Sequence, residues 1–251
     1  MLRSLYTAGT GMLVQRYRMN VTTNNIVNAQ TNGYKKDTLL SRSFADMMLT
    51  RVNDPNVLSH RNDIGDWGPG IHIDEVITSF TGGTTEATER MSDLAIEGDG
   101  FFVVNTPQGE RYTRDGALYV SIDGYLMNAD GHPLQSTTGG NVYVGFDGFS
   151  VDGLGNVTIN GQRAGQIRLV AFEDNGALRK AGHNMFYNYG NSPMAEPDAY
   201  IRQYALESSN VSIVDEMVEM MQLSRSYDTN QRIVRMIDET LQKTVNDVGR
   251  L

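Results

Sequence analysis

Apolar residues recur every three or four positions at both ends of this 251-residue chain, and about every second position in its centre. Near the N-terminus, five of the eight positions on one stripe are apolar, which predicts an amphipathic helix within residues 1–36. The stripe consists of Leu2, Leu5, Gly9, Met12, Arg16, Met19, Thr23 and Ile26. Because a helical glycine costs about 1 kcal/mol relative to alanine, we expect this helix, with Gly9 and Gly11, to need a partner.

Three asparagines follow on the same predicted helix, Asn24, Asn25 and Asn28, and they lead into Asn32-Gly33. Asparagine is a poor helix former, and Asn-Gly is typical of a helix end. The asparagines therefore mark either a frayed helix end or side-chain amides that satisfy backbone groups of neighbouring subunits. The spacing alone does not distinguish these two interpretations.

The C-terminal end, residues 206–251, predicts one long helix from about Ser212 to Val245. Eight of the eleven positions on its main stripe are apolar, and a second apolar stripe lies beside it. The main stripe runs through Ile213, Met217, Met220, Ser224, Tyr227, Gln231, Val234, Asp238, Leu241, Val245 and Val248. The second runs through Val214, Val218, Met221, Ile233 and Ile237. A helix with two apolar sides packs against more than one neighbour, which favours a helical bundle or tube.

In the centre, the period changes to two from Ile71, and Asp-Gly recurs between short apolar segments. The six Asp-Gly pairs stand at 99–100, 115–116, 123–124, 130–131, 147–148 and 152–153. Because Asp-Gly favours tight hairpin turns, residues 71–205 predict an antiparallel, hairpin-rich β body. Residues 37–70 have no clear period and predict an irregular connector. The predicted fold class is α+β, with the terminal segments 1–36 and 206–251 forming a coiled-coil-like assembly domain.

The net charge also differs between these three segments of the chain. The chain carries a net charge of −9, of which residues 1–36 contribute +5 and residues 206–251 contribute −3, leaving −11 for the middle. The negative balance argues against a nucleic-acid partner, and the opposite signs favour pairing between the two terminal helices.

No run of about 18 apolar residues exists, so we expect no membrane insertion. The absence of cysteine excludes disulfides and thiolate chemistry.

Residues suited to catalysis do not form a recognisable pattern. No two of the four histidines, His60, His72, His132 and His183, stand at metal-ligand spacing. Glu97 is the least implausible acid for glycoside hydrolysis, but we expect it to face solvent or to take part in a local hydrogen bond. We therefore expect no catalytic residue, no cofactor and no metal site, and no enzyme activity.

Four motifs, in order along the chain, resemble those of bacterial flagellar rod and hook proteins. Residues 23–35 read TNNIVNAQTNGYK, and residues 94–104 read LAIEGDGFFVV, followed by YTRDG at 112–116. The C-terminal signature consists of LESSNV at 206–211, EMV at 216–218 and RSYDTN at 225–230. The length is similar to that of a rod protein rather than the longer hook proteins. Because residues 79–92 depart from the usual rod pattern, the motifs do not decide whether the nearer paralogue is the distal or the proximal rod protein.

This resemblance implies an axial subunit of the flagellar basal-body rod, in the periplasm, that transmits torque from motor to hook. It also implies passage through the flagellar type III export apparatus without a cleaved signal peptide. The expected partners are copies of the chain itself and other rod or hook subunits. The alternatives are another axial component such as a hook-type protein, a β-rich binding module with an intramolecular helical coil, and a peptidoglycan-active enzyme.

The expected assembly interface lies on the two terminal helices. Its residues are Leu5, Met12, Met19, Asn24, Asn25, Ile26, Asn28, Ile213, Met217, Met220, Tyr227, Val234 and Leu241. The expected structural motif of the β body is Gly98, Asp99, Gly100, Phe101 and Phe102. At least one of the two glycines should have a positive φ angle, and the two phenylalanines should face opposite sides of their strand.

Overall fold

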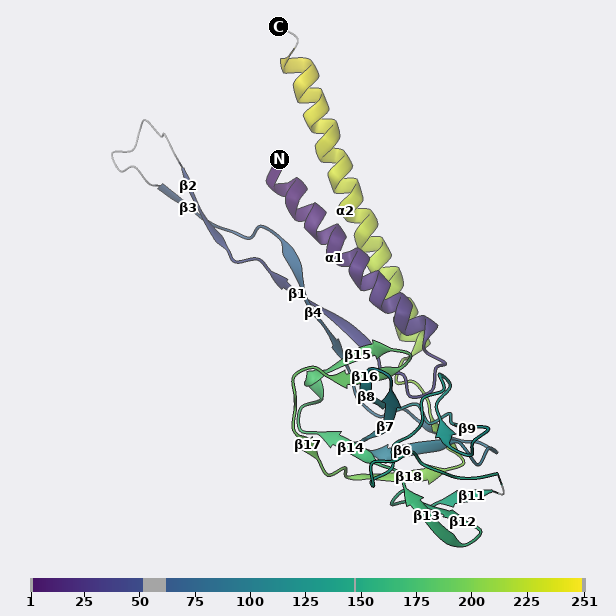
Figure 1. Ribbon diagram of the computed structural model, residues 1–251. Helices are drawn as coiled ribbons and strands as arrows, with labels where there is room; N and C mark the ends of the chain where they lie inside the picture. Colours follow the sequence, from purple (N-terminus) through teal and green to yellow (C-terminus); the bar gives the residue numbers. More distant parts are fainter. Residues whose placement is uncertain (1, 52–61, 147, 250–251) are drawn as a thin grey trace. The chain divides into compact units, whose positions relative to one another are not determined.

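The computed structural model describes residues 2–51, 62–146 and 148–249, and its elements are drawn in Figure 1. The chain forms two compact units. The helical unit contains Met1–Ile26, Asp37–Ile77 and Ile213–Leu251, and the β body contains Val27–Lys36 and Thr78–Ser212. An α+β fold with a helix at each end and a strand-rich body was predicted, and this prediction is confirmed.

The two terminal helices lie side by side and antiparallel in the helical unit (Figure 1). Helix α1 spans Leu2–Val27 and helix α2 spans Ile213–Val248. The predicted extent of the C-terminal helix is therefore confirmed within three residues at either end. After α1 the chain turns through Gly33, whose φ of +65° lies in the left-handed region where glycine carries no steric penalty.

Residues 37–70 are not the irregular connector that the sequence predicted, because the described part of this segment forms a two-stranded ribbon. Strand β1 (Asp37–Ser43) pairs with β4 (Ile71–Thr78), and β2 (Met47–Arg51) pairs antiparallel with β3 (Asn62–Trp67). The predicted turn at 53–56 lies outside the described residues. Among the side chains of this ribbon that the structure describes, most are exposed and Leu39 is the only buried one, so β1 lacks the alternation that reveals a half-buried strand.

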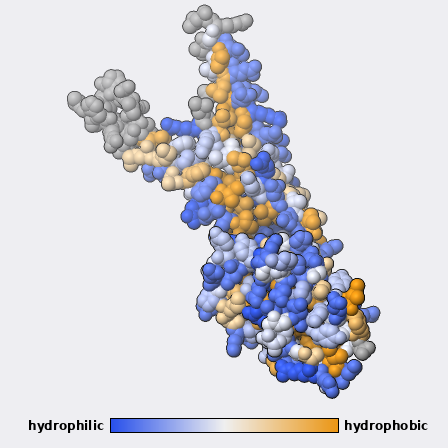
Figure 2. All heavy atoms as spheres, in the orientation of Figure 1, coloured by the Kyte–Doolittle hydropathy of each residue, from blue (hydrophilic) through white to orange (hydrophobic). Residues whose placement is uncertain are grey.

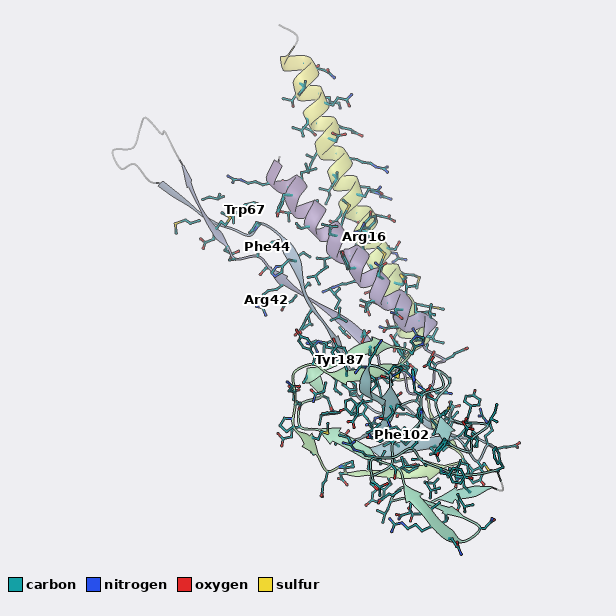
Figure 3. All side chains as sticks on the ribbon, viewed as in Figure 1. Arg16, Arg42, Phe44, Trp67, Phe102 and Tyr187 are labelled. Carbon is teal, nitrogen blue, oxygen red and sulfur yellow. The ribbon has the colours of Figure 1, made fainter. Side chains whose placement is uncertain are left out.

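The ribbon runs along α1. Arg18 Nη2 donates to Ser41 Oγ at 2.9 Å, and a Cβ placed on Gly70 would come within 2.3 Å of Thr10 Oγ1. Phe44 and Trp67 are labelled on the ribbon in Figure 3. The described residues contain no helix long and apolar enough to cross a membrane.

Antiparallel pairing builds the β body, around one six-stranded sheet and several small ones. The six-stranded sheet has the order β15 (Leu178–Gly182), β16 (Met185–Asn188), β8 (Gly109–Thr113), β7 (Phe101–Thr106), β14 (Leu169–Phe172) and β17 (Met194–Ala195). The small sheets pair β5 (Thr85–Ala87) with β19 (Ala205–Glu207), β6 (Leu94–Gly98) with β18 (Ala199–Gln203), β9 (Tyr119–Val120) with β10 (Leu126–Met127), and β11 (Phe149–Val151) with β12 (Asn156–Ile159) and β13 (Gln162–Gln166). A short 3-10 helix, η1 (Asn175–Ala177), precedes β15.

Strand β7 separates two hydrophobic cores. Phe102 and Val104 belong to the larger core, while Phe101 and Val103 belong to a smaller one with Phe186. Successive side chains of a strand point to opposite faces, and here both faces are covered. The prediction that the two phenylalanines face opposite sides is confirmed, with the addition that both are buried; Phe102 is labelled among the strands in Figure 3.

Only some of the Asp-Gly pairs form the predicted left-handed turns. Gly124, Gly131 and Gly148 have positive φ angles, whereas the glycines of the pairs at 99–100, 115–116 and 152–153 do not. The pair at 99–100 joins β6 to β7, which belong to different sheets, so no hairpin forms there. An Asp-Gly pair indicates only a local preference for a turn. The strand that each β-strand pairs with is decided by side-chain packing in the folded body.

The boundaries of the units differ from the sequence-based ones. Residues 27–36 belong to the β body rather than to an N-terminal helical segment, and so do residues 206–212. In contrast, the ribbon from Asp37 to Ile77 belongs to the helical unit.

Candidate assembly interface

Three of the sequence motifs meet in the interior of the β body. Lys35 Nζ donates to Glu207 Oε1 at 2.6 Å and to the carbonyl oxygen of Thr81 at 2.8 Å. Glu207 Oε1 also accepts from the backbone N–H of Gly83 at 2.9 Å, and Arg114 Nη1 reaches Glu207 Oε2 at 3.4 Å. We name Lys35, Arg114 and Glu207 the closure cluster, because they come from the N-terminal, central and C-terminal motifs.

Arg114 extends the closure cluster to the central motif. Its Nη2 donates to the carbonyl oxygen of Gly98 at 2.9 Å, and its guanidinium carbon lies 5.2 Å from the centre of the Phe101 ring. Asp99, which is 87% exposed, stands 4.0 Å from the same Nη2. Burial is the main cause that lowers the pKa of Lys35 from its ordinary value, and the neighbouring Glu207 carboxylate opposes this effect.

Backbone contacts join the same motifs. The N–H of Gly33 donates to the carbonyl oxygen of Glu207 at 2.7 Å, and a Cβ on Gly33 would lie 2.4 Å from the Arg114 carbonyl. Asn210 Oδ1 accepts from the N–H of Lys36 at 2.8 Å, and its Nδ2 donates to the Ser79 carbonyl at 2.9 Å. The motif residues therefore hold the chain's own segments together.

Asn25 has the same kind of role in the helical unit. It is 1% exposed. Its Nδ2 donates to the carbonyl oxygen of Asp37 at 2.9 Å and to Glu216 Oε2 at 3.1 Å, and its Oδ1 accepts from the N–H of Asp37 at 3.0 Å. The amide of Asn25 thus joins α1 to the start of β1 and to the first turn of α2 within one chain.

Helix α2 has one face packed within the chain and an apolar face left exposed. The packed face includes Glu216 and Leu223, both buried, and the half-buried residues Ile213, Met220 and Tyr227 of the predicted main stripe. The stripe residues Met217 and Ser224 are exposed instead, because a shift of one residue from Glu216 or Leu223 turns the helix by about 100°. The exposed apolar face consists of Val214, Met217, Val218 and Met221, which are between 43% and 71% exposed.

We name these four residues the free α2 face. Their spacing of i, i+3, i+4 and i+7 places them on one side of the helix. Hydrophobic surface follows α2 beside hydrophilic surface in the view of Figure 2. Three of the four belong to the second stripe that the sequence indicated, and only Met217 was assigned to the main one.

The structure divides the predicted interface residues by burial. Asn24 and Met217 are exposed and Asn25 is buried. The others are half-buried: Leu5, Met12, Met19, Ile26, Asn28, Ile213, Met220, Tyr227, Val234 and Leu241. Sequence reasoning missed a further exposed stripe on α1, formed by Tyr6, Leu13 and Tyr17, each at least 45% exposed. Its i, i+7, i+11 spacing was available as a signal.

The central motif has the predicted turn geometry at one glycine. Gly98 has a φ of +107°, and a Cβ there would lie 2.3 Å from the Asp198 carbonyl oxygen. Gly100 has no positive φ, but its Cα faces Ala199 and Pro197, whose Cβ atoms would be 3.3 and 3.4 Å from an added Cβ. The close approach of residues 197–199 therefore explains both glycines.

Groups suited to catalysis are dispersed. The Glu97 carboxylate is 48% exposed and is paired with Arg202 at 3.2 Å, as expected for a solvent-facing residue in a local hydrogen bond. His72 stacks on Phe44 with ring centres 4.7 Å apart, and His183 contacts Asp130 at 2.9 Å. His60 lies outside the described residues. Within the described ranges, no three acidic or histidine side chains are grouped to hold a metal ion.

Comparison with known protein families matches all three regions of the chain. The family described as "Flagella basal body rod protein" matches residues 5–35, and "Flagellar hook protein FlgE/F/G D1 domain" matches residues 95–169. "Flagellar basal body rod FlgEFG protein C-terminal" matches residues 202–247. The closure cluster draws one residue from each matched region.

Individual relatives match over nearly their whole length. The flagellar basal-body rod protein FlgG of Bacillus subtilis (strain 168) is 31% identical over 98% of this chain and 99% of its own. The flagellar hook-basal body complex protein FlhO of the same organism is 31% identical over the full length of both chains. The flagellar basal-body rod protein FlgF of Caulobacter vibrioides is 31% identical over 99% of this chain and 97% of its own. The resemblance seen in the motifs is confirmed, and the chain belongs to the flagellar basal-body rod protein family.

Proposed function

We propose that this protein is a structural axial subunit of the flagellar basal-body rod that self-assembles through its terminal helices. The free α2 face carries this proposal. It lies within the segment that matches the C-terminal rod family, and it exposes four large apolar side chains at the start of a helix whose opposite side is already packed. Covering these side chains on assembly would remove apolar surface from water, which stabilises the assembly by about 25 cal/mol per Å² buried.

Helix α1 offers a second surface of the same kind. Tyr6, Leu13 and Tyr17 form an exposed stripe that the ribbon and α2 leave uncovered. Residues 1–36 carry a charge of +5, whereas residues 206–251 carry −3. We infer that the stripe on one subunit packs against the free α2 face of another, with opposite charges at the rim of the contact.

Copies of the chain and other rod or hook subunits are the partners that such a contact would join. A tube of packed helices would transmit torque from motor to hook, since each subunit would be held by two apolar surfaces. We further propose that the subunit reaches the periplasmic rod through the flagellar type III export apparatus without a cleaved signal peptide. Membership of the rod family supports this proposal.

We also propose that the chain has no enzymatic activity. A general acid in a glycosidase is held in an environment that raises its pKa. Glu97 instead faces solvent and is paired with Arg202 at 3.2 Å. This arrangement is that of a surface ion pair, which contributes about 0–1 kcal/mol to stability.

The assembly proposal is tested by placing charge on the free α2 face. Met217→Asp and Met221→Asp, alone and together, should leave the thermal melt of the isolated subunit unchanged within about 2 °C, because both side chains are exposed. On assembly each aspartate would be buried without a partner, at a cost of several kcal/mol. Sedimentation velocity should therefore show loss of oligomers, and cells carrying only the variant should be non-motile.

Ser226→Asp is the matched control, because it adds the same charge at an exposed polar position of α2 that is turned away from the free α2 face. It should assemble and support motility like the unaltered chain. Normal assembly of the Met217→Asp, Met221→Asp double variant would rule out the free α2 face as a subunit contact.

A further inference from the structure

Helix α1 contains two glycines, and packing within the chain explains only one of them. Gly9 and Gly11 both lie inside α1, where glycine is less favourable than alanine because it loses more conformational freedom. A Cβ on Gly11 would lie 3.1 Å from Nδ2 of Asn230 on α2, so close packing accounts for this glycine. A Cβ on Gly9 would meet open space, with no packed neighbour among the described residues within 4 Å.

Gly9 points to a side of α1 that neither the ribbon nor α2 covers. The ribbon approaches α1 at Thr10, since a Cβ on Gly70 would lie 2.3 Å from Thr10 Oγ1, and α2 approaches α1 at Gly11. Successive residues of a helix are rotated by about 100° around its axis. Gly9 therefore faces a third direction, away from both packed neighbours.

Two exposed apolar side chains flank Gly9 on this side of α1. Tyr6 stands three positions before it and Leu13 four positions after it, and they are 54% and 51% exposed. Residues at these spacings lie on the same side of a helix. The missing side chain leaves a hollow between two large apolar side chains, which we name the Gly9 socket.

The free α2 face of a second copy has the chemistry that fits the Gly9 socket. Met217 and Met221 are 50% and 53% exposed, and the unbranched, flexible methionine side chain fills irregular apolar gaps. Helix α1 has no acidic residue and carries the exposed Arg16 on the same side as the socket. On α2, Asp215 and Glu219 are exposed. These opposite charges favour a second copy of the chain as the partner.

We propose that the Gly9 socket receives a methionine of the free α2 face from a second copy of the chain. The socket rests on the assembly contact proposed above and fixes the point at which the two helices come closest. The distance between packed helices depends on the side chains at their contact, so a residue without a side chain allows the closest approach. A larger residue at position 9 would hold the two helices apart.

Enlarging position 9 tests the socket in assembly of the purified full chain. Gly9→Ala improves the helix propensity of α1 and meets open space within the subunit. It should nevertheless raise the concentration needed for assembly about fivefold, and Gly9→Leu at least about fiftyfold, because overpacking a contact is unfavourable. Ser4→Ala is the matched control, since Ser4 is exposed and lies about 140° around α1 from Gly9; this variant should assemble like the unaltered chain. If Gly9→Ala assembles at the unaltered concentration or a lower one, the proposal is overturned.

Disulfide trapping identifies what enters the socket, because the chain has no cysteine of its own. Leu13→Cys is mixed with Met217→Cys or with Met221→Cys and oxidised with copper phenanthroline. At least one mixture should give a disulfide-linked dimer, and adding Gly9→Ala to Leu13→Cys should reduce its yield. Ser226→Cys, turned away from the free α2 face, should give none. Absence of a dimer with both methionine positions would refute the socket.

The socket and the assembly contact can fail separately. If the Met217→Asp, Met221→Asp double variant loses assembly while Gly9→Ala keeps it, the free α2 face remains a subunit contact and only the Gly9 socket is refuted. If the double variant assembles normally, both proposals are wrong.

Discussion

Gly98 and Gly109 have almost the same backbone angle but very different surroundings. Their φ values are +107° and +108°, which non-glycine residues rarely adopt. A Cβ on Gly98 would lie 2.3 Å from the Asp198 carbonyl oxygen, whereas nothing lies within 4 Å of one on Gly109. At the residue scale, the two sites therefore separate the cost of the backbone angle from the cost of close packing.

Gly109→Ala should lower the free energy of unfolding by about 1–2 kcal/mol, which is the backbone contribution alone. Gly98→Ala should lower it by about 4 kcal/mol, since the β6–β18 pair must also move apart. Denaturant melts of the two variants measure the difference. Equal losses would show that residues 197–199 can shift without cost and that the close approach does not explain Gly98.

At the scale of elements, α1 is held by polar contacts as well as by its buried apolar residues Ala8 and Val14. Asn25 joins it to β1 and to α2 through Asp37 and Glu216, and Arg18 joins it to the ribbon through Ser41. The helix was expected to need a partner, and within the chain it contacts both the ribbon and α2. A ribbon of two strands is itself marginal in water, so these elements stabilise one another.

Asn25→Ala should therefore lower the stability of the helical unit by about 3 kcal/mol, because buried hydrogen bonds to Asp37 and Glu216 are lost. Circular dichroism at 222 nm would follow the loss of helix on heating. Asn20→Ala provides the control on the exposed side of the same helix and should change stability by at most about 0.5 kcal/mol. If both variants melt alike, Asn25 does not hold the three elements together.

At the scale of the whole molecule, the compact β body includes residues that lie outside the strand-forming segment 71–205 predicted from the sequence. Truncation at the sequence-based boundaries, to residues 71–205, would remove Lys35 and Glu207 and leave Arg114 buried without its carboxylate partner. The compact unit instead draws on Val27–Lys36 and extends to Ser212. The ends of the chain therefore contribute to two units at once.

A fragment of residues 27–212 should fold with a cooperative thermal transition and dispersed amide resonances. A fragment of residues 71–205 should not, because both chain segments that complete the closure cluster are absent. Comparing the two by near-ultraviolet circular dichroism and nuclear magnetic resonance tests the boundary. A well-folded 71–205 fragment would show that the shorter, sequence-based body is an independent domain.

The sequence by itself determined the two terminal helices, the strand-rich centre and the family, because helical and strand periods and the motif residues are local properties of the chain. It did not determine the ribbon, since β1, which does not alternate, pairs with β4, which was assigned to the β body beyond the predicted connector. Nor did it reveal which side of α2 stays exposed, a choice made by the position of α1. Only the tertiary structure brought Lys35, Arg114 and Glu207 together. Their contacts join segments 93 and 172 residues apart, and a local sequence pattern does not predict contacts over such separations.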